Sequence, residues 1–550
     1  MMILLKKMLQ LQTKIAGKMK QTKTDVLIIG SGPIGAAYAR MINDALPDTE
    51  IIMIDLGPKV SDTIGQHVSN ITDPEKKERA QVLSQGPQKK VYPMVSVPER
   101  AMAVQRGDLT PEYLARAGTH LVSDNPEDLK ANDMPAMALA SNLGGMGIHW
   151  TCACPRPGNE EKISFIPEDE LDAAFVKAEE LLQVTQKAFP VRAESEMILN
   201  TLNECLGKNH SPNRHAQPMP LACKTDDEGT RYWVGPDVVL GDTIRHKNFE
   251  IRSETICRKL QVEIRNPESD ADSYRDRNHI SGAIIEHLPT KTMETIQAKI
   301  VITACDALRT PQLLWNSGIR PRALGHYLNE HPFIFTFVEV NPTSDIVHRT
   351  SPDPLVGVFW VPYDAPNHPF HGQIMHMDMS PMKTVVTDPG KHIVGLGWGC
   401  IKQLSYDDQI IFSETEKDYF GMPAMSFKYK FSADDLAAIE AAKKFQAKVA
   451  SLFGKEIKDG QQTLMPPGSS LHYEGTTRMG VTDDGESVCD SYSKVWGYDN
   501  LFVGGNGVIP MGTTSNPTLT SVAMAVRASQ KIIAILNELK VTKQQKAVTT

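Results

Sequence analysis

The stretch VLIIGSGPIG at residues 26–35 decides the fold. Residues 26–29 form a short, wholly apolar run, as expected of a buried parallel strand. Gly30, Gly32 and Gly35 follow in the pattern G-x-G-x-x-G, and a helix-like sequence, AAYARMINDAL, continues from them. Between a strand and a helix, these glycines permit a tight turn, close approach of a pyrophosphate, and close helix packing. The stretch therefore predicts a dinucleotide-binding unit of the Rossmann type.

An acidic residue completes this unit. The apolar run at residues 51–54 ends at Asp55, 20 residues after Gly35. A carboxylate there accepts hydrogen bonds from ribose hydroxyls and repels the 2′-phosphate of NADP. The alternative is that close helix packing alone requires the glycines. The motif does not separate FAD from NAD, so that choice depends on the rest of the chain.

Segments far along the chain predict further parts of the same architecture. Residues 300–304 predict another buried strand, residues 310–318 a helix that ends at a glycine, and residues 165–184 an amphipathic helix. Residues 331–470 alternate strand-like runs with loops. Residues 501–503 predict a strand, and after Pro517 a periodic helix runs to about residue 536, before a polar tail.

We therefore expect an α/β fold with discontinuous domains. A Rossmann-like domain takes residues 24–75, 136–162, 245–330 and 470–540, because the first and last segments both resemble nucleotide-domain parts. Residues 163–244 and 331–469 form an α+β substrate-binding domain built on a β-sheet. Residues 76–135 are a surface excursion or oligomerisation arm, and residues 1–23 a disordered leader.

Bulk properties exclude several classes of protein. The 550 residues carry a net charge of -8, which disfavours nucleic-acid binding. Eight cysteines are too few for a disulfide scaffold, and Cys152 and Cys154 lack the second half of a zinc site, so we expect no metal. The sequence contains no run of 18 apolar residues, the length that a membrane-spanning helix needs. We expect a cytoplasmic protein that forms a homo-oligomer.

Two carboxyl-terminal segments carry a family resemblance. LHYEGTTRMG at residues 471–480 and NPTLT at residues 516–520 are similar to segments of the glucose–methanol–choline (GMC) oxidoreductases. The resemblance implies the GMC fold and FAD as cofactor. It also implies that His472 and Asn516 face the flavin as catalytic residues, and that Gly505 and Asn506 bind the cofactor. The alternatives are a satisfied core histidine for His472 and a helix N-cap for Asn516.

A third segment resembles one branch of this family. SNLGGMGIHWT at residues 141–151 is similar to the flavin loop of pyranose oxidases, a branch that includes bacterial glycoside 3-oxidases. The resemblance implies that His149 is bonded covalently to the 8α-methyl group of the flavin. It also implies that Thr151 places a hydroxyl near the hydride-accepting nitrogen of the flavin. The alternatives are that His149 is only a neighbour and that Thr151 serves loop hydrogen bonding.

QIMHMDMSP at residues 373–381 lies where that branch has a mobile substrate loop. The resemblance implies that Gln373, His376 and Asp378 contact the substrate, although the aromatic residues that normally follow are absent. The alternative is a solvated loop. The missing aromatics predict a more open pocket.

The resemblance implies oxidation of an alcohol, in which a neutral histidine takes the hydroxyl proton and FAD takes the hydride. We expect a secondary hydroxyl of a pyranose or glycoside, at carbon 2 or carbon 3, to become a ketone, with dioxygen reoxidising the flavin to give hydrogen peroxide. One alternative is a sugar dehydrogenase that uses a quinone. Another is a flavin-containing lyase, and a third is an NAD-binding module.

Overall fold

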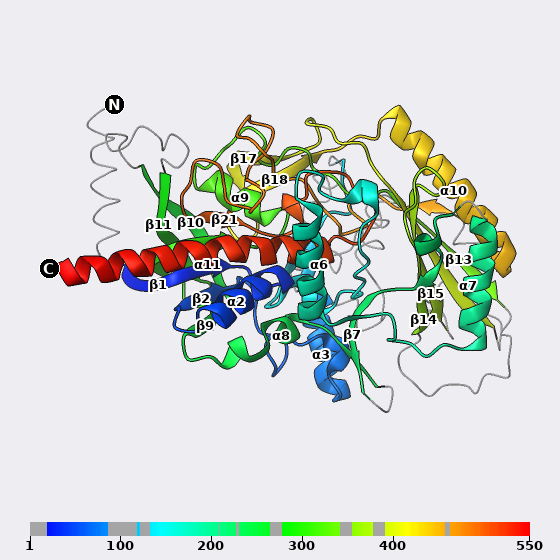
Figure 1. The fold of residues 1–550 in the computed structure, drawn as a ribbon, viewed down its shortest axis with the longest axis horizontal. Helices are drawn as coiled ribbons and strands as arrows, with labels where there is room; N and C mark the ends of the chain where they lie inside the picture. Colours follow the sequence, from blue (N-terminus) through cyan, green and yellow to red (C-terminus); the bar gives the residue numbers. More distant parts are fainter. Residues whose placement is uncertain are drawn as a thin grey trace.

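The computed structural model describes residues 19–85, 118–121, 133–207, 210–226, 230–264, 278–340, 355–377, 391–456 and 462–549. Two seven-stranded sheets organise these residues, one in each half of the molecule (Figure 1). The first sheet has the order β10-β11-β12-β1-β2-β9, and β21 also pairs with β12. Its strands are β1 (Lys20–Ile29), β2 (Ile51–Ile54), β9 (Phe249–Arg252), β10 (Thr255–Ile264), β11 (Asn278–His287), β12 (Thr292–Thr303) and β21 (Leu501–Val503).

The middle of the first sheet is parallel, as the buried apolar runs predicted. β12, β1, β2 and β9 pair in parallel, and β21 pairs in parallel with the end of β12. Helices α2 (Pro33–Ala45) and α11 (Thr518–Thr549) pack against each other beside it (Figure 1). The carboxyl ends of these strands therefore meet at one edge, where open α/β sheets bind their ligands.

The second sheet is antiparallel and has the order β19-β13-β16-β15-β14-β6, with β20 also on β13. Helices α7 (Ala193–Leu206) and α10 (Ala433–Phe453) cover its outer face (Figure 1). The strands are β6 (Gln217–Pro218), β13 (Phe333–Val340), β14 (Leu355–Val361), β15 (Phe370–Met377), β16 (His392–Cys400), β19 (Lys455–Glu456) and β20 (Thr463–Leu464).

Smaller elements complete the fold. Helices α6 (Glu168–Leu182), α8 (Pro236–Leu240) and α9 (Arg309–Asn316) flank the first sheet. The minor sheets are β3 (Gly118–Leu121) with β4 (Ala138–Ser141), the three-stranded sheet β5 (Val184–Thr185), β7 (Leu221–Thr225) and β8 (Arg231–Trp233) with β7 in the middle, and β17 (Gln409–Lys417) with β18 (Pro423–Lys428). Short 3-10 helices include η1 (Val68–Asn70), η4 (Gly145–Ile148) and η9 (Asn506–Val508).

Three expected boundaries need correction. Strand β1 begins at Lys20, which pairs with Glu294, so the last residues of the expected leader are part of the sheet. Helix α11 continues to Thr549 instead of ending near residue 536. Residues 163–244 divide between the halves, because α6 packs in the core of the first sheet and α7 in that of the second. Residues 1–18 and most of the expected arm lie outside the described residues.

Within the described ranges, α11 is the one helix long and apolar enough to cross a membrane, over Thr518–Thr542. However, 72% of its most apolar window is buried inside the molecule. The helix packs along α2 and α6, and Val526 and Ile532 lie in the same core cluster as Ile28 of β1. Its apolar sequence is therefore that of a core helix.

Candidate active site

A cavity of about 1780 Å³ opens where the carboxyl ends of the parallel strands meet. Gly30, Asp55 and Gly505 line it from the ends of β1, β2 and β21. Gln373 and Met375 of β15 line it from the second sheet. The cavity thus lies between the two halves and has room for a dinucleotide together with a substrate.

The three glycines of the first loop differ in what surrounds them. Gly30 has φ +111°, and a Cβ there would lie 2.2 Å from the carbonyl oxygen of Ala304. A Cβ on Gly35 would lie 2.1 Å from the carbonyl oxygen of Gly30. By contrast, the nearest described atom to a Cβ on Gly32 is 3.9 Å away, and Gly32 lines the cavity. Two glycines therefore serve packing, and the middle one leaves the backbone open to a ligand.

Asp55 is tied into this loop from the end of β2. Its Oδ2 accepts from the Ser31 backbone N–H at 3.0 Å and the Ser31 hydroxyl at 2.6 Å, and its Oδ1 accepts from the Gly57 N–H at 2.8 Å. Burial raises its pKa, and these hydrogen bonds oppose the rise. A carboxylate has about four acceptor positions, so one remains on Oδ1 for a ribose hydroxyl.

The carboxyl-terminal segment forms another wall of the cavity. Gly505 has φ +104°, and a Cβ there would meet no atom of the described residues within 4 Å. Asn506 lines the cavity, and its Oδ1 accepts from the Ser521 hydroxyl at 2.7 Å. Thr518, the first residue of α11, also lines the cavity. The amino-terminal ends of α2 and α11 thus both face the space, and each end favours negative charge.

These residues fit FAD. Gly32 and Gly505 leave an open backbone surface, and Asp55 lies where a ribose would lie. The N-termini of α2 and α11 suit the pyrophosphate and the polar edge of an isoalloxazine. Gly30, Gly32, Asp55, Gly505 and Asn506 line the cavity and would hold the cofactor, whereas Gly35 does not line it and serves the packing of α2 against the loop.

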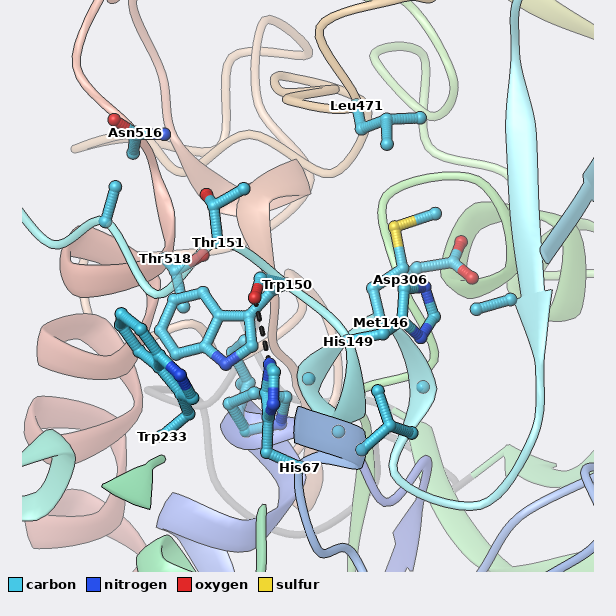
Figure 2. Close-up of a pocket in the computed structure, with 18 of the residues that line it drawn as sticks. His67, Met146, His149, Trp150, Thr151, Trp233, Asp306, Leu471, Asn516 and Thr518 are labelled. Carbon is cyan, nitrogen blue, oxygen red and sulfur yellow. Dashed lines mark hydrogen bonds between the residues drawn. The ribbon is translucent and has the colours of Figure 1, made fainter. Parts of the chain in front are cut away.

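The segment expected to form the flavin loop also borders the cavity. Figure 2 shows His149 beside Met146 and Asp306, and Thr151 on the side of Trp150 toward Asn516. His67 supports the loop from below, because its ring nitrogen Nε2 lies 3.0 Å from the Trp150 carbonyl oxygen (Figure 2). Nδ1 of His67 accepts from the Ser69 N–H at 3.2 Å, so its Nε2 carries the proton that it donates to Trp150.

His472 and Asn516, 44 positions apart, meet on the wall of the cavity. Nε2 of His472 lies 3.3 Å from Nδ2 of Asn516. The side-chain amide of Gln373 donates to Oδ1 of Asn516. The amide of Asn516 thus faces His472 and Gln373 instead of capping α11, and His472 lines the cavity instead of the core. Three of the expected site residues form one connected group.

His331 is a fourth member that sequence reasoning missed. Its Nε2 lies 2.8 Å from Nδ1 of His472. Burial lowers the pKa of His331 to about 4. Burial, with His331 and His371 nearby, lowers the pKa of His472 well below its ordinary value. His472 is therefore neutral at neutral pH and able to accept a proton.

Glu161 is a second residue that was missed. This buried carboxylate accepts five hydrogen bonds: from the Gly158 N–H, and from the N–H and hydroxyl groups of both Thr514 and Ser515. It thereby holds the backbone directly before Asn516. Neither Glu161 nor His331 lies in a periodic pattern, and each contacts partners more than 100 positions away, so no local signal identifies them.

The expected substrate residues are not all brought together. Gln373 and Met375 point into the cavity, so the alternation of β15 turns His376 to the opposite face. There its Nε2 lies 2.7 Å from Nδ1 of buried His392. The structure therefore places His376 away from the cavity where the sequence analysis expected it to contact the substrate. His376 lies an odd number of positions after Gln373 on the same strand, so the two side chains point to opposite faces of the sheet. Asp378 lies outside the described residues.

A dinucleotide cradle that faces a neutral histidine and an asparagine defines a cofactor-dependent oxidoreductase. The GMC oxidoreductase family matches the chain at residues 158–333 with its amino-terminal part and at residues 411–525 with its carboxyl-terminal part. The chain therefore belongs to the GMC family of FAD-dependent oxidoreductases, which act on CH–OH donors.

Individual relatives cover almost the whole chain. It is 39% identical over 519 residues to a C-glycoside 3-oxidase of Microbacterium trichothecenolyticum, which covers 93% of this chain and 96% of that protein. It is 30% identical over 558 residues to a pyranose 2-oxidase of Tricholoma matsutake, covering 93% and 94%. The crystal structure of a pyridoxine 4-oxidase from Mesorbium loti matches with a TM-score of 0.58 at 14% identity, over 92% of this chain and 99% of that one. This last match shows the fold alone.

Proposed function

We propose that this enzyme oxidises a secondary hydroxyl of a pyranose or a glycoside, at carbon 2 or carbon 3, to a ketone. Dioxygen is the proposed electron acceptor, with hydrogen peroxide as product. The observation that carries the proposal is the group of His472, Asn516 and Gln373 beside the dinucleotide cradle. The 39% identity to a C-glycoside 3-oxidase over nearly the whole chain supports the substrate class.

The side chains of this group divide the work on an alcohol. Nε2 of His472 accepts the hydroxyl proton, because the lowered pKa keeps the ring neutral at working pH and leaves a lone pair free to take the proton. Asn516 and Gln373 offer amide groups that orient the hydroxyl and its neighbour on the ring. FAD, when bound, accepts the hydride from the same carbon. A pocket that pairs the other sugar hydroxyls favours one carbon, because wrong poses leave buried polar groups without partners.

The test is an anaerobic screen of hexopyranoses and their O- and C-glycosides, in which loss of the absorbance of oxidised FAD reports reaction. The ketone is then identified by nuclear magnetic resonance after aerobic turnover. We expect a 2-keto or 3-keto sugar. A primary-alcohol aldehyde, a lactone from carbon 1, or no reaction with any sugar contradicts the proposal, and the last result favours the lyase alternative. Comparing turnover with dioxygen and with a quinone separates oxidase from dehydrogenase.

We also propose that His149 carries FAD covalently. Its place on the cavity wall directly after η4, and the similarity of its loop to that of pyranose oxidases, support this. Acid precipitation of the pure enzyme is expected to leave the yellow colour in the pellet, and His149→Ala is expected to release it. Colour in the supernatant of the unmodified enzyme contradicts the link and leaves the alcohol chemistry unaffected.

A further inference from the structure

The hydrogen bond between His331 and His472 joins a buried imidazole, His331, to a half-buried one, His472, that lines the cavity. The nitrogens are 2.8 Å apart, and the ring centroids 4.7 Å apart. Both rings are neutral at neutral pH, because burial lowers the pKa of His331 to about 4 and that of His472 well below its usual value. Two neutral imidazoles share one proton in such a bond. In the ring that holds this proton, the other nitrogen is unprotonated and can accept a hydrogen bond.

Asn516 indicates which ring holds the proton. Its Nδ2, an amide nitrogen that only donates, lies 3.3 Å from Nε2 of His472. In the structure this amide has its oxygen toward Gln373, whose Nε2 donates to Oδ1 of Asn516. Nε2 of His472 is therefore the acceptor, and the neutral ring carries its proton on Nδ1.

The surroundings of His331 are compatible with this direction. Its Nδ1 is buried and has no hydrogen-bond partner among the described residues, and its Nε2 faces Nδ1 of His472 at 2.8 Å. A neutral His331 that carries its own proton on Nδ1 has an unprotonated Nε2, which can accept from His472.

We propose that His331 is a positioning residue that fixes the tautomer of His472. The unprotonated Nε2 of His331 accepts the Nδ1–H of His472. This leaves Nε2 of His472 unprotonated on the side of the substrate. This inference rests on the proposed role of His472 as the base. When the substrate O–H bond breaks, the proton joins Nε2 of His472, and the charged ring still donates its Nδ1–H to His331. Without His331, either tautomer is accessible, and only one of them is a base at this position.

His371 provides a matched control. The titratable groups that act on His472 are His331 and His371. His371 accepts at Nδ1 from the indole N–H of Trp360 at 3.1 Å, so its own tautomer is fixed independently. His371→Gln thus changes a neighbouring buried ring and leaves the His331–His472 bond in place.

The direct test is the tautomer itself. Proton–nitrogen correlation spectra of protein with ¹⁵N-labelled histidine are recorded, and the His472 signals are identified by their absence in His472→Gln. We expect the Nδ1–H form in the unmodified protein, in His371→Gln and in His331→Gln, whose amide oxygen can accept the same N–H. We expect mixed or Nε2–H forms in His331→Leu. The Nε2–H form in the unmodified protein, or an unchanged Nδ1–H form in His331→Leu, overturns the proposal.

The rate of flavin reduction by substrate provides the second test. His331→Leu is expected to lose about tenfold or more, and His331→Gln to recover most of the loss, with FAD content unchanged. An equal loss in His371→Gln, or no recovery in His331→Gln, would indicate a purely structural role. Normal flavin reduction in His472→Ala would refute the assignment of His472 as the base. The spectra of the unmodified protein would still show which tautomer His472 adopts, so the two proposals fail separately.

Discussion

His472 is the side chain on which the proposed chemistry depends most directly, since its Nε2 faces Asn516 and the cavity. His472→Ala should bind FAD and yet reduce it about a hundredfold more slowly or worse, the usual cost of a lost general base. Asn516→Ala should lose less, because it removes a hydrogen-bond donor and leaves the base. Both rates are measured by anaerobic rapid mixing with the sugar that the screen identifies.

Two controls accompany these variants. The FAD content and the circular dichroism spectrum of each variant should match those of the unmodified enzyme. Near-normal reduction by His472→Ala would contradict its assignment as base. An unfolded Asn516→Ala would instead mean that Asn516 is needed to begin α11.

At the scale of elements, the connection between β1 and α2 makes a prediction about two neighbouring glycines. Gly32→Ala should fold normally and lose FAD, because its methyl group would meet no close protein atom and would project from the surface that the pyrophosphate approaches. Gly30→Ala should fail to fold, because its backbone has φ +111° and a Cβ would lie 2.2 Å from the Ala304 carbonyl oxygen.

Circular dichroism and the ratio of FAD to protein distinguish the two outcomes. A folded Gly32→Ala protein with a full complement of FAD would show that the pyrophosphate does not approach this loop. A well-folded Gly30→Ala protein would show that the loop can adopt another conformation.

Elements with a local signal could be predicted from the sequence, and contacts across the chain could not. The apolar run before Gly30 and the periodic run after Pro517 identified β1 and α11, and the family resemblance identified the pairing of His472 with Asn516. The ends of β1 and α11 were placed too far inward, because their outer residues are polar and their conformation depends on a neighbour such as β12.

The errors at the site have the same origin. His376 was assigned to the substrate from its spacing in the sequence, but a strand sends alternate side chains to opposite faces. His331 was missed because its partner lies 141 positions away. Neither a motif nor a period of 2 or 3.6 residues conveys such a contact.

For the whole molecule, buried histidines predict the dependence of stability on pH. Burial lowers the pKa of several of them: His67, His331 and His376 to about 4, and His368 and His371 to about 3. Each binds fewer protons in the folded than in the unfolded state between its folded pKa and about 6.5. Their effect on stability is therefore absent above that range, and stability falls as the pH drops through it.

The buried histidines should accordingly lower the melting temperature as the pH falls from about 6.5 toward 4. Buried carboxyl groups act in the opposite direction, because burial raises the pKa of Glu330 to about 7, that of Glu474 well above its usual value, and those of Asp55, Asp237, Asp408 and Asp490. The contribution of one histidine is therefore measured as a difference: His376→Gln, which lies away from the cavity, should keep the FAD and show a shallower decline than the unmodified protein. The measurement is thermal denaturation followed by circular dichroism across this range. An equal or steeper decline in His376→Gln would contradict the prediction.

The position of β21 and α11 in the first sheet has a consequence for how the protein is made. β1, from residue 20, has β12 as its partner, and β12 in turn pairs with β21, which starts at residue 501. The half of the molecule whose first segment is synthesised earliest is thus the last to complete its fold, because α11, which packs against α2, is synthesised at the end. The second sheet, which lies between these segments in the chain, can form while the apolar surface of the first is still exposed. Nascent chains that stop before residue 501 should therefore depend on chaperones until translation ends.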